Sequence, residues 1–164
     1  NAVASAAMAE LLEVPKRGIK RALASIPQVQ HRLEAKPSEG GVRIIDDAFN
    51  SNPIGAASAL EVLSQCTAGR RILVTPGMVE LGEMESEANY EFGKQAAVAC
   101  DLAVLVGVNR VEPIRKGLLD GGFDKENIWV VSTLNAGLEK LKGYLQPGDT
   151  MLLENDLPDQ YDNQ

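Results

Sequence analysis

The sequence predicts an α/β fold: a doubly wound, mostly parallel sheet of six strands, preceded by two helices. Two observations support this prediction. Four short runs rich in Val, Ile and Leu, at residues 71–75, 102–106, 128–131 and 150–153, alternate with helical patterns at 54–65, 86–100, 111–120 and 134–144. Each run is apolar along its whole length, as is typical of parallel strands that helices cover on both faces.

A hairpin precedes this alternating region and completes the predicted sheet. Residues 32–36 and 42–46 are strand-like, and Pro37-Ser38-Glu39-Gly40-Gly41 between them is typical of a turn. The second hairpin strand becomes the fifth parallel strand, and the first pairs with it as the single antiparallel strand. Sheets of this kind are Rossmann-like, and their ligands bind at the carboxyl ends of the strands.

Residues 2–14 and 16–25 are predicted to form two helices, separated by Pro15 and closed by Pro27. The first is apolar nearly all round, so we expect it to be deeply packed, in part against a surface outside this chain. The chain opens with Asn1 rather than Met. We therefore expect a fragment of a longer protein.

The composition of the 164 residues excludes several classes of protein. No apolar run approaches the roughly 18 residues that span a bilayer. The first apolar stretch lacks a basic leader and carries Glu10 and Glu13, so no secretory signal is expected. The net charge of −7 lies in an acidic body and argues against a nucleic-acid surface. Cys66 and Cys100 are predicted to be buried free thiols of a cytoplasmic protein.

Unusual polar residues follow the predicted strands at the edge where a ligand would bind. The string Asp46-Asp47-Ala48-Phe49-Asn50-Ser51-Asn52-Pro53 ends one strand and leads into a helix. Neighbouring strand residues point to opposite faces, so the two aspartates cannot act as one pair. Either one accepts hydrogen bonds from ribose hydroxyls, or both only cap a turn. Asn52 is predicted to cap the helix that begins at Pro53, and Asn50 is either a turn or a site residue.

Arg32 stands at the junction between the two helices and the sheet. A guanidinium suits bidentate binding of phosphate oxygens, although an isolated surface arginine is usually only solvated. His31 is the only histidine, which supports neither a catalytic triad nor a metal cluster. The sequence contains neither of two glycine-rich phosphate-binding patterns, Gly-x-x-x-x-Gly-Lys-Ser/Thr and Gly-x-Gly-x-x-Gly. This chain alone is therefore not expected to bind a triphosphate.

Three stretches resemble the C-terminal domain of the Mur ligases: His31-Arg32-Leu33-Glu34, the residues from 44 to 53, and Gly77-Met78-Val79-Glu80-Leu81-Gly82-Glu83. The opening Asn1-Ala2-Val3-Ala4-Ser5-Ala6-Ala7 resembles the helix that closes the family's central ATPase domain. This resemblance implies that residues 1–30 end that domain and residues 31–164 form the C-terminal domain. It also implies an ATP-dependent ligase of peptidoglycan precursor synthesis. The branch it is most similar to joins D-alanyl-D-alanine to a UDP-linked muramoyl-tripeptide through an acyl phosphate.

The same resemblance implies roles for individual residues. Arg32, the one residue expected to act in catalysis, would approach the terminal phosphate of ATP when the domains close. Asp47 would hold the ribose hydroxyls, Asn50 would lie near the nucleotide, and Asn1 would touch the adenine. The side of the amine substrate would be lined by Met78, Glu80 and Leu81. The ligands of Mg²⁺ are expected in the central domain, so no metal ligand is assigned here and the isolated chain is expected to be inactive.

Three departures from the family pattern leave alternatives open. Gly77 stands where the family usually has Asp, and Asn89 where it commonly has His. Glu154-Asn155-Asp156-Leu157 replaces the common Lys-Gly-Ser-Arg, which exchanges cations for anions. One alternative is a Mur-like ligase with a different amino-acid acceptor. The other is a non-catalytic nucleotide-binding module that keeps the fold without the reaction.

Overall fold

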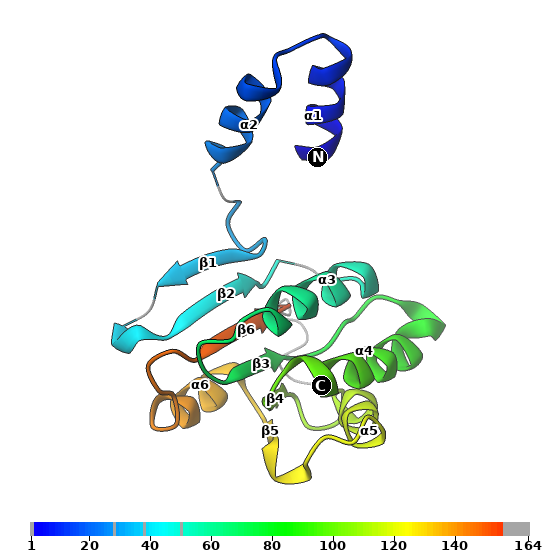
Figure 1. Cartoon of the computed structure of the whole chain (residues 1–164). Coiled ribbons are helices and arrows are strands. Elements are labelled where there is room, and N and C mark those ends of the chain that lie inside the picture. The colour runs from blue at the N-terminus through cyan, green and yellow to red at the C-terminus, as the bar shows by residue number, and fades with distance from the viewer. Residues whose placement is uncertain (1, 28, 38, 50, 156–164) are drawn as a thin grey trace.

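A computed structural model of the chain describes residues 2–27, 29–37, 39–49 and 51–155 (Figure 1). It contains one six-stranded sheet with the order β1-β2-β6-β3-β4-β5. The strands are β1 (Glu34–Pro37), β2 (Arg43–Asp47), β3 (Arg71–Thr75), β4 (Leu102–Val106), β5 (Ile128–Val131) and β6 (Thr150–Glu154). Five of them pair in parallel, and β1 pairs antiparallel with β2. The predicted fold class is therefore confirmed.

Helices cover both faces of this sheet (Figure 1). On one face pack α3 (Pro53–Ser64), α4 (Glu85–Ala99) and α5 (Glu112–Asp120), where Leu63 and Phe92 join Leu73 of β3 in one apolar core. On the other face lies α6 (Leu134–Lys142), whose Leu141 packs in a second core with Ile72. Neighbouring residues of β3 thus enter different cores, which explains why its sequence is apolar throughout.

Local sequence signals place the element ends close to the predicted bounds. Asn52 caps α3 as predicted, because its Oδ1 accepts a hydrogen bond from the N–H of Gly55 at 3.0 Å. The strand β1 begins two residues later than predicted. The reason is that His31 and Leu33 have φ values of 56° and 49°, which are left-handed rather than extended.

The helices α1 (Ala2–Leu11) and α2 (Lys16–Ala24) project away from the sheet (Figure 1). Neither contains a buried residue, and Val3 and Leu11 are 83% and 78% exposed. The prediction that the first helix is deeply packed is therefore wrong for the described chain. Its apolar sequence favours burial, but α2 is the helix that it packs against here.

Two other expectations concern the cysteines and the membrane. Cys100 is buried as predicted, whereas Cys66 is only partly buried, and both are free thiols. Within the described ranges, no helix has the length and apolar character needed to cross a bilayer.

Candidate functional site

The carboxyl ends of three neighbouring strands form the edge at which the predicted site residues gather. The strand β6 lies between β2 and β3, and its Glu154 is in register with Asp47 of β2. The loops that follow β2 and β3 therefore leave the sheet on either side of the end of β6. This edge is where open α/β sheets bind their ligands.

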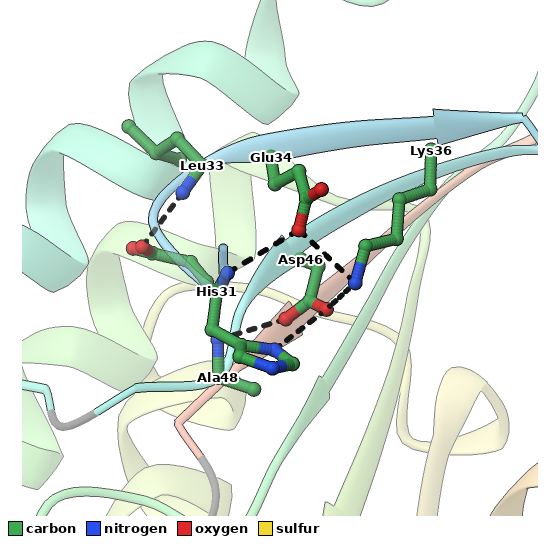
Figure 2. A network of polar contacts seen from close by, with 7 residues as sticks. His31, Leu33, Glu34, Lys36, Asp46 and Ala48 are labelled. Atoms are coloured by element: carbon green, nitrogen blue, oxygen red, sulfur yellow. Dashed lines mark hydrogen bonds and ion pairs between the residues drawn. The ribbon is translucent and has the colours of Figure 1, made fainter. Parts of the chain in front are cut away.

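Two aspartates of β2 hold the turn that precedes β1, and Figure 2 shows the contacts of Asp46. The N–H of Leu33 donates a hydrogen bond to Asp47 Oδ1 at 2.9 Å, and His31 Nδ1 lies 2.9 Å from Asp46 Oδ2. The N–H of His31 also donates to Glu34 Oε2 at 3.3 Å. A left-handed backbone is unfavourable for side chains of this size, and these hydrogen bonds offset its conformational cost.

Arg32 lies between the two anchored residues of this turn. Its guanidinium carbon is 4.5 Å from the centroid of the Phe49 ring, a cation–π distance, and both side chains are exposed. Phe49 follows β2 by two residues, so the ring and the carboxylate of Asp47 come from the same strand end. The turn therefore presents an accessible guanidinium close to Asp47, in a position that a phosphate group can reach.

The two aspartates themselves have different environments. Asp46 is 5% exposed and is bound by Lys36 Nζ at 2.5 Å, by His31 and by the N–H of Ala48 (Figure 2). Burial alone would raise the pKa of Asp46, but the hydrogen bonds from Lys36 and His31 outweigh it and lower the pKa. Asp47 is half-buried, and the bond from Leu33 leaves it further lone pairs. Asp46 therefore serves the fold, and Asp47 is the better candidate for a ligand.

The loop after β3 is fixed by Asn89 of α4. Asn89 Oδ1 accepts from the N–H of Met78 at 2.9 Å, and its Nδ2 donates to the carbonyl oxygen of Met78 at 2.8 Å. The side chain of Met78 is 1% exposed and belongs to the core beneath the loop. Glu80 is exposed with a φ of 63°, and Leu81 is half-buried. The loop thus offers the side chains of Glu80 and Leu81, and only the backbone of Met78, to a ligand.

Two of the departures from the family pattern are linked by packing. Gly77 has a φ of 86°, and a Cβ there would lie 2.8 Å from Asn89 Oδ1 and 2.9 Å from Ile114 Cδ1. Its carbonyl oxygen accepts from Asn155 Nδ2 at 2.7 Å. An aspartate cannot replace Gly77 while Asn89 keeps this position. The conformation of the loop therefore depends on Gly77 and Asn89 together.

Glu154 lies at the same edge of the sheet, and the sequence indicates it only as a departure from the family pattern. It is 1% exposed, Ser51 Oγ donates to its Oε1 at 2.5 Å, and its Oε2 has no hydrogen-bond partner among the described residues. Burial raises the pKa of Glu154 to about 8; the bond from Ser51 opposes this shift, and neighbouring Asp47 adds to it. Glu154 is therefore mostly protonated at neutral pH. The signal that was available is an acidic residue ending an apolar strand.

Two predicted site residues, Asn1 and Asn50, lie outside the described residues. The others fall into two groups along one edge of the sheet. Arg32 lies in the turn before β1, next to the Leu33 that is bound by Asp47, and the group of Met78, Glu80 and Leu81 lies on the loop after β3. The end of β6, with Glu154, stands between the strands that carry the two groups.

Comparison with known proteins gives consistent matches. The family model described as "Mur ligase, glutamate ligase domain" matches residues 31–154. The UDP-N-acetylmuramoyl-tripeptide–D-alanyl-D-alanine ligase of Mycobacterium bovis is 30% identical over 94% of this chain and 34% of that protein. The UDP-N-acetylmuramoylalanine–D-glutamate ligase of Rubrobacter xylanophilus is 29% identical over 93% of this chain and 32% of that protein.

Solved structures show the same fold. The MurF ligase of Thermotoga maritima, crystallised in complex with ADP, superposes with a TM-score of 0.69 and 25% identity, covering 82% of this chain and 29% of that one. MurF of Acinetobacter baumannii gives a TM-score of 0.73 with 23% identity, covering 94% and 33% of the two chains. The present chain thus spans about a third of the length of these proteins.

Proposed function

The chain belongs to the Mur ligase family, and on this premise we propose that it forms the C-terminal part of an ATP-dependent ligase of peptidoglycan precursor synthesis. The proposed reaction adds D-alanyl-D-alanine to a UDP-muramoyl-tripeptide through an acyl phosphate. One observation carries the proposal. Arg32 and Asp47 belong to separate motifs of the sequence, yet the bond between Leu33 and Asp47 brings them together at the ligand-binding edge.

In the proposed site, Asp47 and Arg32 bind different parts of the nucleotide. Asp47 accepts hydrogen bonds from the ribose hydroxyls, and Arg32 binds the terminal phosphate, where a guanidinium can make two parallel hydrogen bonds. A rigid turn favours this role because catalysis of phosphoryl transfer depends mainly on positioning and charge neutralisation. Asn50 is proposed to lie near the nucleotide and Asn1 near the adenine.

The metal ion of the proposed reaction is assigned to another part of the protein. Within the described ranges there is no group of three or more His, Cys, Asp or Glu side chains that could hold a metal ion. The described residues therefore do not fit a Mg²⁺ site. We propose that the preceding domain holds Mg²⁺ and that the isolated chain is inactive.

The amine substrate is proposed to lie along the loop after β3. Glu80 can pair with the ammonium or amine end of the acceptor, and Leu81 supplies apolar contact beside it. Met78 contributes backbone groups, because its side chain is buried in the core. The close packing of Gly77 against Asn89 keeps this segment in one conformation.

A second candidate function is a ligase of the same family with a different acceptor. The similarity to a D-glutamate ligase extends over 93% of this chain and favours keeping this candidate. The departures at Gly77 and Glu154 fall at the same edge of the sheet and alter its charge. The loss of a carboxylate at Gly77 bears on the choice of acceptor, because Gly77 lies on the loop that is proposed to line the amine substrate.

The test is phosphate release by the full-length protein with ATP, Mg²⁺ and UDP-muramoyl-tripeptide. We expect turnover with D-alanyl-D-alanine and none with D-glutamate or free D-alanine. Turnover only with an acceptor other than D-alanyl-D-alanine would support the second candidate instead. ATP binding without turnover of any acceptor would leave a non-catalytic nucleotide-binding module and overturn the proposal.

A matched pair of variants tests the role of Arg32. Arg32→Ala is expected to lower kcat by about 100-fold, the usual loss when one group that stabilises transition-state charge is removed. Arg115→Ala is the control, because Arg115 is exposed on α5 and pairs with Glu112 of the same helix. Equal activity of both variants would remove Arg32 from the site.

A further inference from the structure

Two carboxyl groups meet at the end of the central strands, and the proposed function uses only one of them. Asp47 of β2 and Glu154 of β6 are direct neighbours in the parallel register. Glu154 is almost fully buried and holds Ser51 through Oε1, while its Oε2 has no hydrogen-bond partner among the described residues. A buried polar atom without a partner is costly and calls for an explanation.

A single proton shared by Asp47 and Glu154 accounts for the closeness of the two carboxyl groups and for the missing partner of Glu154 Oε2. Two adjacent carboxylates repel each other, so one of them keeps its proton. The N–H of Leu33 donates to Asp47 and favours its anion, and Glu154 is the more deeply buried of the two. The proton therefore resides on Glu154. Carried on Oε2, it can be donated to the carboxylate of Asp47, and the orphaned oxygen then has a partner.

We propose that protonated Glu154 is a positioning residue for Asp47, which it holds by a carboxyl–carboxylate hydrogen bond in the orientation that binds the nucleotide ribose. This inference rests on the proposed nucleotide role of Asp47. Burial, which raises the pKa of Glu154 to about 8, keeps the proton in place at neutral pH. Above that pH the pair becomes doubly charged, and Asp47 is driven from its orientation.

None of the other groups described around Glu154 supplies a competing charge. Ser51 reaches it from the loop before α3, and the adjacent register position on β3 is Thr75, which is buried and uncharged. The next residue, Asn155, is engaged with the carbonyl oxygen of Gly77. Among the residues that the structure describes, Asp47 is the one ionisable group that contributes to the pKa shift of Glu154. A pH dependence centred near 8 therefore reports on this pair.

The experiment measures the Kd of the full-length protein for ATP with Mg²⁺ between pH 7 and 9.5. If only the protonated form binds, the Kd of the wild type rises about tenfold per pH unit above about 8, because the competent fraction falls in that proportion. Glu154→Gln keeps a hydrogen-bond donor without an ionisation. Its Kd should lie within about threefold of the wild type at pH 7 and stay constant. Glu139→Gln on the exposed face of α6 is the control and keeps the wild-type profile.

Each outcome decides between distinct claims. A Glu154→Gln profile that rises in parallel with the wild type overturns the role of Glu154. Unchanged ATP affinity in Asp47→Asn overturns the nucleotide role of Asp47, on which this inference rests. A carboxyl titration of the wild type by nuclear magnetic resonance provides a readout without nucleotide or substitution. An ordinary pKa for Glu154 there, near 4.5, overturns the shared proton.

Discussion

The N–H of Leu33 donates to Asp47 Oδ1 at 2.9 Å, so the carboxylate proposed to bind the nucleotide also fixes the turn that carries Arg32. His31 on the other side of Arg32 contacts Asp46 through its side chain, with Nδ1 2.9 Å from Oδ2. The consecutive aspartates of β2 thus anchor the residues on both sides of the arginine. A displacement of either anchor is expected to disturb the guanidinium as well as its own contacts.

Substitution of Asp47 can separate its two roles. Asp47→Asn keeps an oxygen acceptor for Leu33 but loses the charge, whereas Asp47→Ala loses both. We expect both variants to raise the KM for ATP about 10- to 100-fold, the effect of losing a hydrogen bond to a charged group. Only Asp47→Ala should also lower kcat, since it releases Arg32. Steady-state kinetics of the full-length protein, with the surface variant Asp120→Asn as control, measures this, and an equal kcat in both variants would refute the link between the two residues.

Local patterns in the sequence predict the sheet and part of the site. The runs at 71–75 and 102–106 predict buried parallel strands because both of their faces meet helices. Arg32 and Asp47 are predicted as site residues because each lies in a motif that resembles the family. The contact between Ser51 and Glu154 joins residues 103 positions apart, and no local pattern encodes it. The exposure of α1 could not be predicted, because a helix that is apolar all round indicates burial but does not identify the surface that buries it.

Asp46 is expected to stabilise the fold rather than to bind a ligand. Asp46→Asn should lower the free energy of unfolding at pH 7 by about 1–2 kcal/mol through its weakened hydrogen bonds to Lys36 and His31. The folded pKa of Asp46 is lowered, so its contribution is present above the unfolded value of 3.8 and is lost as the pH falls through the folded pKa. Urea denaturation at pH 7 and pH 3 measures this.

Two comparisons make the Asp46 experiment decisive. The difference between the wild type and Asp46→Asn should shrink at pH 3, because Asp46 of the unfolded wild type is then mostly protonated and its charge contributes less to stability. Glu61→Gln on the exposed surface of α3 should change stability by less than about 0.5 kcal/mol at both pH values. If Asp46→Asn lowers the free energy of unfolding by the same amount at pH 3 and pH 7, the role of Asp46 does not depend on its charge.

Gly77 is expected to tolerate no side chain, and Gly82 provides the matched control. Both have a positive φ, but a Cβ at Gly82 meets nothing within 4 Å, whereas at Gly77 it collides with Asn89 and Ile114. Gly82→Ala should cost about 1 kcal/mol of stability from the backbone alone. Gly77→Ala should cost about 1–3 kcal/mol more, because the core beneath the loop must move. Urea denaturation of the two variants compares them directly, and equal losses would show that the contact with Asn89 does not restrict the loop.

The buried carboxyl of Glu154 makes a distinctive prediction for stability. Its pKa is about 8 in the folded protein and near 4.5 in the unfolded chain, so between these values the folded state holds a proton that the unfolded state releases. The free energy of unfolding must therefore fall as the pH rises from about 4.5 to about 8, by up to ~1.4 kcal/mol per pH unit, and level off above that. Glu154→Gln has no such proton, so its free energy of unfolding should rise relative to that of the wild type across this range. Urea denaturation of both proteins at pH 5, 6.5 and 8 measures the trend. A constant difference between them would mean that Glu154 is ionised in the folded protein and that burial does not hold its proton.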